Sequence, residues 1–168
     1  MKAILVSALS LDGKIGRDSA DRLDWVSSEN KGFFGRVSRE AGAVVFGHKT
    51  FKAIKKPLKE RLVVVLTSRP EEKESTPGRV EFTDQEPEEI LANLEKRGFE
   101  KVIVGGGQEI NRLFLGKDLV DEIWLVIEPV VLGGGLDLFS LEDSETRFKL
   151  LAMEKINHSL AVLKYGRR

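Results

Sequence analysis

The sequence predicts a single α/β domain with a mainly parallel sheet and antiparallel strands at its C-terminal end. Its strand-like segments are continuous apolar runs rather than alternating ones, which indicates strands buried on both faces. Amphipathic helical patterns separate these runs, an order typical of parallel sheets, and the last two runs resemble a hairpin. The buried strands are expected over Ala3–Ala8, Ala43–Phe46, Leu62–Leu66, Val102–Val104 and Ile123–Ile127.

The helices expected between these strands have recognisable boundaries. Ser27 or Ser28 can cap the first helix. Pro57 ends the second, and Pro87 followed by two glutamates suits the first turn of the third. The expected helices cover residues 28–40, 48–56, 88–97 and 106–116, and the C-terminal hairpin pairs 148–156 with 160–165.

Composition restricts the classes of partner. The 168 residues include 27 basic and 27 acidic side chains, and this balance argues against a general binder of nucleic acid or anionic membranes. The absence of cysteine excludes disulfides and thiolate metal sites, and the sequence has no cluster of metal ligands. The apolar run at the start is too short for a signal peptide or a membrane span. We therefore expect a cytoplasmic protein without a nucleic-acid, membrane or metal partner.

A run of three glycines follows the fourth buried strand in "VIVGGGQEI", residues 102–110. One glycine suffices for a turn, whereas three favour a backbone that a ligand approaches closely, such as an anion at a helix N-terminus. The run comes late in the chain and has Ile110 where a dinucleotide fingerprint has its last glycine, so a standard Rossmann domain is not expected.

Two further strand ends carry groups that suit phosphate. "GAVVFGHKT" fails as a P-loop because His48 intrudes before the lysine, but Gly47, His48, Lys49 and Thr50 still offer amides, an imidazole, an ammonium and a hydroxyl. A solvated basic helix start explains this segment equally well. "LTSRP" places Thr67, Ser68 and Arg69 at the next strand end, where an ordinary turn before Pro70 is the competing interpretation.

Together, these three strand ends favour a dinucleotide. The carboxyl ends of parallel strands meet at one edge of the sheet, where ligands bind. A dinucleotide with a pyrophosphate and a third phosphate would use all three ends. "SLDGKIG" (10–16) adds Asp12 at the same edge, either in a plain turn or as a carboxylate that anchors or protonates a substrate.

The motifs named so far, together with "DWVSSEN" and "LVDEIWLVIEPVVLGGGLDLF", occur in an order that resembles the dihydrofolate reductase superfamily over nearly the whole chain. Within it, "SLDGK" and "LVDE…PVVLGGG" are most similar to the reductase domain of riboflavin biosynthesis. The resemblance implies a dihydrofolate reductase-like, three-layer α/β/α domain over residues 1–168 and an NADPH-dependent reductase. The nicotinamide would supply the hydride, and the protein would orient it.

The resemblance also implies positions for the cofactor. Gly105, Gly106, Gly107 and Gln108 would approach the pyrophosphate. The segments Gly47–Thr50 and Thr67–Arg69 would hold the phosphates of the adenosine half, and their cations favour NADPH over NADH. Ala8, Ile15 and Gly16 would line the nicotinamide. The substrate would lie beside the helix over 27–40.

Two substrates compete for this site. Dihydrofolate reductases have a carboxylate four residues before a phenylalanine; counting back from Phe34 gives Asn30, while Glu29 points elsewhere on the helix. Their strand threonine corresponds to Val126. Because this chain lacks both the carboxylate and the threonine, the resemblance favours a ribosylamino-pyrimidine 5′-phosphate as substrate. The opened ribose of that substrate would be reduced to a ribitol with the help of Asp12. Riboflavin-type reductases tend to have a glutamate where this chain has Gly105, so dihydrofolate remains the alternative.

Catalytic roles are thus expected for Asp12 and Asn30, and substrate contacts for Glu29, Phe34 and Val126. A non-catalytic nucleotide-binding protein is the third interpretation, and the acidic residue at the nicotinamide end argues against it. Because related proteins are commonly dimers and "LVIEPVVLGGG" is apolar on both faces, we also expect a homodimer.

Overall fold

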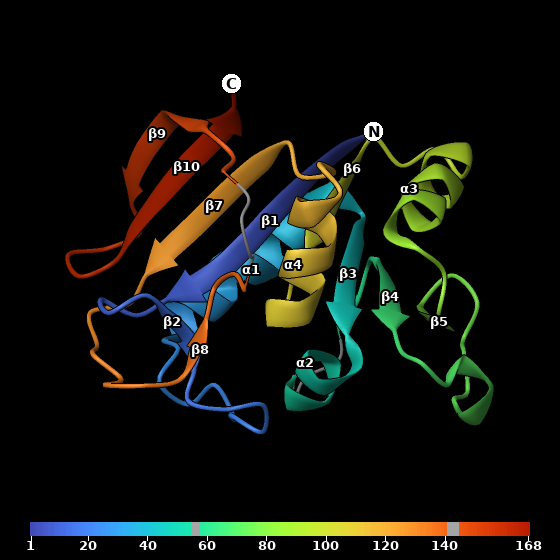
Figure 1. Ribbon diagram of the computed structural model, residues 1–168, viewed down its shortest axis with the longest axis horizontal. Helices are drawn as coiled ribbons and strands as arrows, with labels where there is room; N and C mark the ends of the chain where they lie inside the picture. Colours follow the sequence, from blue (N-terminus) through green and yellow to red (C-terminus); the bar gives the residue numbers. More distant parts are fainter. Residues whose placement is uncertain (55–57, 141–144) are drawn as a thin grey trace.

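The computed structural model describes residues 1–54, 58–140 and 145–168, and its centre is an eight-stranded sheet. The strand order is β5-β4-β3-β6-β1-β7-β10-β9, with β10 antiparallel to both of its neighbours (Figure 1). The main strands are β1 (Lys2–Leu9), β3 (Ala43–Gly47), β4 (Leu62–Leu66), β5 (Val80–Thr83), β6 (Lys101–Val104), β7 (Glu122–Ile127), β9 (Phe148–Lys155) and β10 (Ala161–Arg167). A second, two-stranded sheet pairs β2 (Lys14–Gly16) with β8 (Leu136–Asp137).

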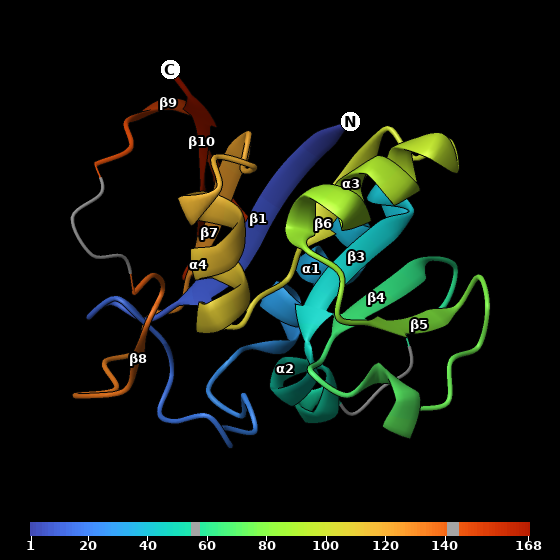
Figure 2. The same ribbon diagram turned by 45° about the vertical axis from the view of Figure 1, so that its right-hand side comes forward.

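Helices cover both faces of the large sheet. They are α1 (Ser28–Ala41), α2 (His48–Ala53), α3 (Pro87–Lys96) and α4 (Gln108–Gly116), and a 3-10 turn covers Pro70–Glu72. One core cluster joins the sheet to α3 and α4, and the other joins its opposite face to α1. Successive β1 residues alternate between them: Ala3 and Leu5 pack toward α3 and α4, and Ile4 and Val6 toward α1. Figure 2 shows α4 and α1 on opposite sides of the strands, so the expected three layers and the mainly parallel sheet are confirmed.

The five predicted buried strands and the C-terminal hairpin are all present. Strands β5, β2 and β8 were not predicted. The helix expected over 48–56 ends at Ala53, and the last part of that prediction lies at residues 55–57, outside the described residues. Helix α4 begins at Gln108 rather than at residue 106, because Gly106 has φ +81° and therefore cannot be helical. No described helix has the length and apolarity needed to cross a membrane.

The parallel strands bring the segments with candidate site residues together at one edge of the sheet. β1, β3, β4 and β6 are mutually parallel, with Val44 opposite Ile103 and Phe46 opposite Val65 in the pairing register. Their carboxyl ends consequently lie at one edge, which Figure 1 shows next to α2 and the start of α4. β7 lies inside the sheet between β1 and β10, while β9 is an edge strand.

Candidate functional site

A cavity of about 1350 Å³ opens at the carboxyl ends of the parallel strands. It is larger than the ~300–1,000 Å³ typical of pockets for a single small ligand, so it has room for a dinucleotide together with a substrate. Most of the residues predicted from the sequence line it: Ala8, Ile15, Gly16, Asn30, Phe34, Gly47, His48, Lys49, Thr50, Thr67, Ser68, Gly105, Gly106, Gly107 and Gln108. Four do not: Asp12, Glu29, Arg69 and Val126.

The glycine run has a separate structural reason at each position. A Cβ on Gly105 would overlap the ring of the buried Phe46, and Gly106 has a left-handed backbone. A Cβ on Gly107 would lie 3.0 Å from Thr50 Oγ1. Gly107 is also the N-cap of α4 and offers no side-chain cap, so the first backbone amides of this helix have no intrahelical partner. The residues that carry them line the cavity. This is an electropositive helix end of the kind that receives anions.

The start of α2 lies beside that of α4. Gly47 N donates to Gly106 O at 2.8 Å, and α2 likewise has a glycine N-cap without a side-chain cap. His48 follows, with its ring 6.3 Å from that of Phe82 in an edge-on arrangement. Burial lowers the pKa of His48, and the charges of Lys52 and Lys73 lower it further. Burial and the two lysines therefore favour the neutral imidazole, and an arriving anion would offset the effect of the lysines.

Arg69 does not join this group of cations. Its guanidinium is exposed and pairs with Glu72 at 3.2 Å, three residues further along. Thr67 and Ser68 line the cavity. The Arg69 guanidinium, which was expected beside them, instead contacts the 3-10 helix that directly follows Arg69. Lys73 ends that turn, and its charge helps to lower the pKa of His48. Lys73 was not among the residues predicted from the sequence. Asp84 also lines this end of the cavity, at the end of β5.

At the opposite end, Asn30 lies on the first turn of α1 and is buried. Its Nδ2 donates to Glu128 Oε1 at 2.8 Å, across 98 residues of sequence. Glu128 directly follows β7 and is itself buried. Glu128 was not among the residues predicted from the sequence. Its only signal was a single carboxylate within the apolar segment "LVIEPVV".

Val126 and Glu29 are not available to a substrate in the way expected. Val126 is fully buried and packs in the core beneath α1, because alternation along β7 points its side chain into that layer. Glu29 is exposed, and its carboxylate accepts from Ser28 Oγ at 2.8 Å, a hydrogen bond that lowers the pKa of Glu29. Phe34 does line the cavity and packs against Phe46 with ring centroids 5.8 Å apart.

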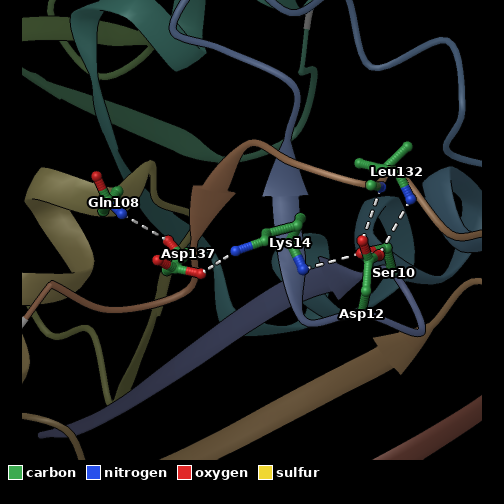
Figure 3. A network of polar contacts seen from close by, with 7 residues as sticks. Ser10, Asp12, Lys14, Gln108, Leu132 and Asp137 are labelled. Carbon is green, nitrogen blue, oxygen red and sulfur yellow. Dashed lines mark hydrogen bonds and ion pairs between the residues drawn. The ribbon is translucent and has the colours of Figure 1, made fainter.

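Asp12 lies just outside the cavity and holds a loop. Its carboxylate accepts from Ser10 Oγ at 2.7 Å, from Leu132 N at 3.1 Å and from Gly133 N at 2.8 Å (Figure 3). The Ser10 bond is the main cause that lowers the pKa of Asp12 to about 2, and the two amides contribute. Asp12 is therefore ionised near neutral pH, and its oxygens already have donors.

The same network reaches the start of α4. Ser10 Oγ also accepts from Lys14 N at 2.8 Å, and Lys14 Nζ pairs with Asp137. Gln108 Nε2 donates to the Asp137 carbonyl at 3.0 Å (Figure 3). The loop after β1, the segment after β7 and the first residue of α4 are thus joined by polar contacts. This arrangement places Ile15 and Gly16 against the cavity.

Comparison with known proteins supports the fold and gives the family. The model of the RibD C-terminal domain matches residues 1–162. A protein from Shewanella sp. PV-4, described provisionally as a riboflavin biosynthesis protein, superposes with a TM-score of 0.81 at 27% identity, covering 100% of this chain and 99% of that one.

Two more distant structures share the fold. A diaminohydroxyphosphoribosylaminopyrimidine deaminase/5-amino-6-(5-phosphoribosylamino)uracil reductase from Thermotoga maritima has a TM-score of 0.82 at 22% identity over 99% of this chain and 56% of its own. Dihydrofolate reductase from Enterococcus faecalis, complexed with NADP(H), has a TM-score of 0.76 at 20% identity, covering 99% and 96%. The dihydrofolate reductase-like fold expected from the sequence is therefore confirmed.

Proposed function

This chain belongs to the RibD C-terminal domain family, and from this premise we propose that it is an NADPH-dependent reductase of a ribosylamino-pyrimidine 5′-phosphate in riboflavin biosynthesis. The observation that carries the proposal is the convergence of two uncapped helix starts and the Thr67–Ser68 strand end on one cavity. This arrangement suits a ligand that carries several phosphates. The family match and the likeness to the Shewanella protein support the choice of pathway.

The cofactor would lie along the strand ends. Amides at the starts of α2 and α4 would hold the pyrophosphate, and the nicotinamide would lie against Ala8, Ile15 and Gly16. NADPH supplies the hydride, while the chain binds and orients both reactants.

The 2′-phosphate of the cofactor would lie near His48. The residues around His48 fit this group better than Arg69 does, because Lys52 and Lys73 already act on that imidazole and Arg69 is paired with Glu72. Asp84 also lines the cavity, and a carboxylate there would accept a hydrogen bond from the 2′-hydroxyl of NADH. The cations around His48 would therefore favour NADPH, and Asp84 would favour NADH.

The substrate would occupy the space between the nicotinamide and α1, where Asn30 and Phe34 line the cavity. Phe34 offers a ring face to a heterocycle, and Asn30 offers a neutral amide. An amide cannot supply the negative charge that helps to protonate a pterin, and this supports a pyrimidine over dihydrofolate.

The catalytic role of Asp12 remains a prediction. With its carboxylate ionised and bonded to Ser10, Leu132 and Gly133, Asp12 would reach a substrate only after the loop releases it. Its present contacts fit a positioning role, in which Asp12 fixes the loop that carries Ile15 and Gly16. Turnover by Asp12→Asn distinguishes the two roles: a substrate contact lowers kcat, whereas loop positioning weakens NADPH binding first.

Dihydrofolate is the second candidate substrate, and one observation favours it. Glu128 brings a carboxylate to within a hydrogen bond of Asn30, so an acid is present near the substrate end even though residue 30 is not acidic. Glu128 does not line the cavity, which weighs against direct contact with a pterin. The two candidates are separated by following NADPH oxidation with each substrate under identical conditions.

A further inference from the structure

Glu128 is a buried carboxylate whose hydrogen-bond donors are all neutral groups. Its Oε1 accepts from Ser27 N at 3.0 Å, from Ser27 Oγ at 2.8 Å and from Asn30 Nδ2 at 2.8 Å. Only 3% of Glu128 and 3% of Asn30 is exposed. Among the described residues no cation lies within ion-pair distance of Glu128. One carboxylate oxygen, Oε1, accepts all three of these hydrogen bonds, and burying a carboxylate away from any cation is unfavourable for a purely structural link.

This contact determines which way the Asn30 amide faces. Glu128 Oε1 accepts from Asn30 Nδ2 as it does from Ser27 N, so the NH₂ group of Asn30 faces Glu128 and the amide oxygen faces away. In the described part of the chain, no donor reaches Asn30 Oδ1, and this atom is not one of the enclosed unpartnered atoms, which are Trp25 Nε1 and Asn111 Oδ1. Because Asn30 lines the cavity, the free side of its amide is an acceptor open to a ligand.

The backbone on both sides of this contact is fixed as well. Ser27 is the N-cap of α1, and its Oγ accepts from Asn30 N at 3.2 Å. Glu128 N donates to Leu9 O at 2.9 Å, which holds the end of β7 against β1. Ser27 thus contacts both partners, and the three residues form a rigid corner between the start of α1 and the sheet.

We propose that Glu128 is a positioning residue that fixes the Asn30 amide with Oδ1 toward the cavity, so that the site selects a heterocycle presenting a neutral N–H donor there. The inference rests on the proposed function for the presence of a heterocycle and deepens it by naming the group that is recognised. A 5-amino-6-ribosylamino-pyrimidine carries such N–H groups. A pterin, by contrast, must be protonated during its reduction, and a neutral amide oxygen supplies no negative charge that would help.

The test compares Glu128→Gln, Asn30→Asp and the double variant with wild type. Glu122→Gln is the matched control, because Glu122 begins the strand that Glu128 follows and so lies at the end away from the cavity. KM, kcat, the Kd of NADPH and the melting temperature are measured for each variant.

Glu128→Gln weakens the constraint on the Asn30 amide. The introduced glutamine has a weaker acceptor oxygen than a carboxylate and carries an NH₂ group in place of the other oxygen, so it holds the Asn30 amide less firmly in one orientation. KM for the heterocycle should rise about 2- to 10-fold, the range for the net contribution of one hydrogen bond, while the Kd of NADPH stays within about twofold. Glu122→Gln should leave both constants unchanged.

Asn30→Asp provides a readout that a structural link would not change. Two carboxylates at hydrogen-bond distance share one proton, so the pH profile of KM should gain a group that titrates above the ordinary range of an aspartate. In the double variant the introduced glutamine donates to the introduced aspartate, and this additional titration should disappear. Glu128→Gln with an unchanged KM and a lowered melting temperature would overturn the inference, because the network would then only attach α1 to β7.

The variants are assayed with whichever of the pyrimidine phosphate or dihydrofolate the wild type reduces. Reduction of dihydrofolate alone would contradict the proposed substrate, and the KM shift of Glu128→Gln would still decide the role of Glu128. If wild-type protein reduces neither, both the proposed function and this inference fail.

Discussion

Asn30 and Glu128 lie 98 residues apart in sequence and share a 2.8 Å hydrogen bond that connects the first turn of α1 to the end of β7. The strand order explains how they meet. β7 is adjacent to β1, and the chain returns from β1 through the small strand β2 to Ser27, the cap of α1. The end of the cavity proposed to hold the substrate is thus built by the same contacts that begin the first helix.

The cap of α1 should therefore affect both stability and substrate binding. Ser27→Ala removes a hydroxyl that accepts from Asn30 N and donates to Glu128. Loss of an N-cap costs about 1 kcal/mol of unfolding free energy. Denaturant unfolding should show this loss, and KM for the heterocycle should rise as well. Ser27→Thr is the control, since threonine retains the hydroxyl, and an equal loss in both variants would contradict the role assigned to the hydroxyl.

Sequence reasoning located the strand ends because each depends on a local pattern. The apolar runs of β1, β3, β4, β6 and β7 predicted buried strands directly. β5 was missed because it is a short edge strand without a continuous apolar run. Its four residues alternate between apolar and polar, and all four are only half-buried. Glu128 could not be identified for a different reason: its burial depends on donors that are 98 and 101 residues away.

The glycine run should tolerate substitution poorly at its first position. Gly105→Ala places a methyl group inside the ring of Phe46, and overpacking of this kind costs about 1–3 kcal/mol. Thermal unfolding should show a lower melting temperature, and adding Phe46→Leu should recover part of it. Gly35→Ala is the matched control in α1, where a Cβ meets nothing within 4 Å. That change should stabilise the protein by about 0.5–1 kcal/mol. Equal effects at the two positions would contradict the packing explanation.

The preference for NADPH should depend on Lys73 more than on Arg69. Because Lys73 acts on His48 while Arg69 pairs with Glu72, Lys73→Ala should weaken NADPH binding about fivefold relative to NADH. Arg69→Ala should change this ratio less. Quenching of protein fluorescence by each nucleotide provides the Kd values. A larger change in Arg69→Ala would return the 2′-phosphate to the position expected from the sequence.

The binding of NADPH should also depend on the protonation of His48. In the free protein the pKa of His48 is lowered by burial and by Lys52 and Lys73, so the ring is neutral at pH 7. A phosphate dianion beside it raises that pKa, and binding therefore takes up a proton. NADPH affinity should increase as pH falls from about 8 toward 6, where the phosphate itself begins to protonate. NADH is the control, and an identical pH dependence for both nucleotides would contradict the assignment.

Asp12 should influence stability at low pH. Its pKa of about 2 lies below the ordinary value of 3.8, so the native state binds fewer protons than the unfolded state between these values. The stabilisation is fully present above pH 3.8 and is lost as pH falls toward 2. Melting temperatures followed from about pH 6 to about pH 2 should decline less steeply in Asp12→Asn than in wild type. Glu74→Gln, an exposed carboxylate, should leave the slope unchanged. A wild-type slope in Asp12→Asn would contradict the anchoring role.

The homodimer expected from the sequence would use the edge strand rather than β7. Because β7 lies between β1 and β10, the apolar surface at the C-terminal end belongs to β9, where Leu150, Leu151 and Met153 are exposed. Light scattering should give twice the chain mass for wild type. Leu151→Glu combined with Met153→Glu should give the monomer mass, and a dimer that survives both changes would place the interface elsewhere.

The most direct test follows reduced nicotinamide absorbance while the protein is mixed with NADPH and either the ribosylamino-pyrimidine 5′-phosphate or dihydrofolate. Oxidation of NADPH with the pyrimidine phosphate alone, yielding the ribitylamino product, is the expected result. It would identify the neutral Asn30 amide as suited to a pyrimidine. Oxidation with dihydrofolate alone would contradict the proposed substrate and show that Asn30, supported by Glu128, is sufficient for a pterin.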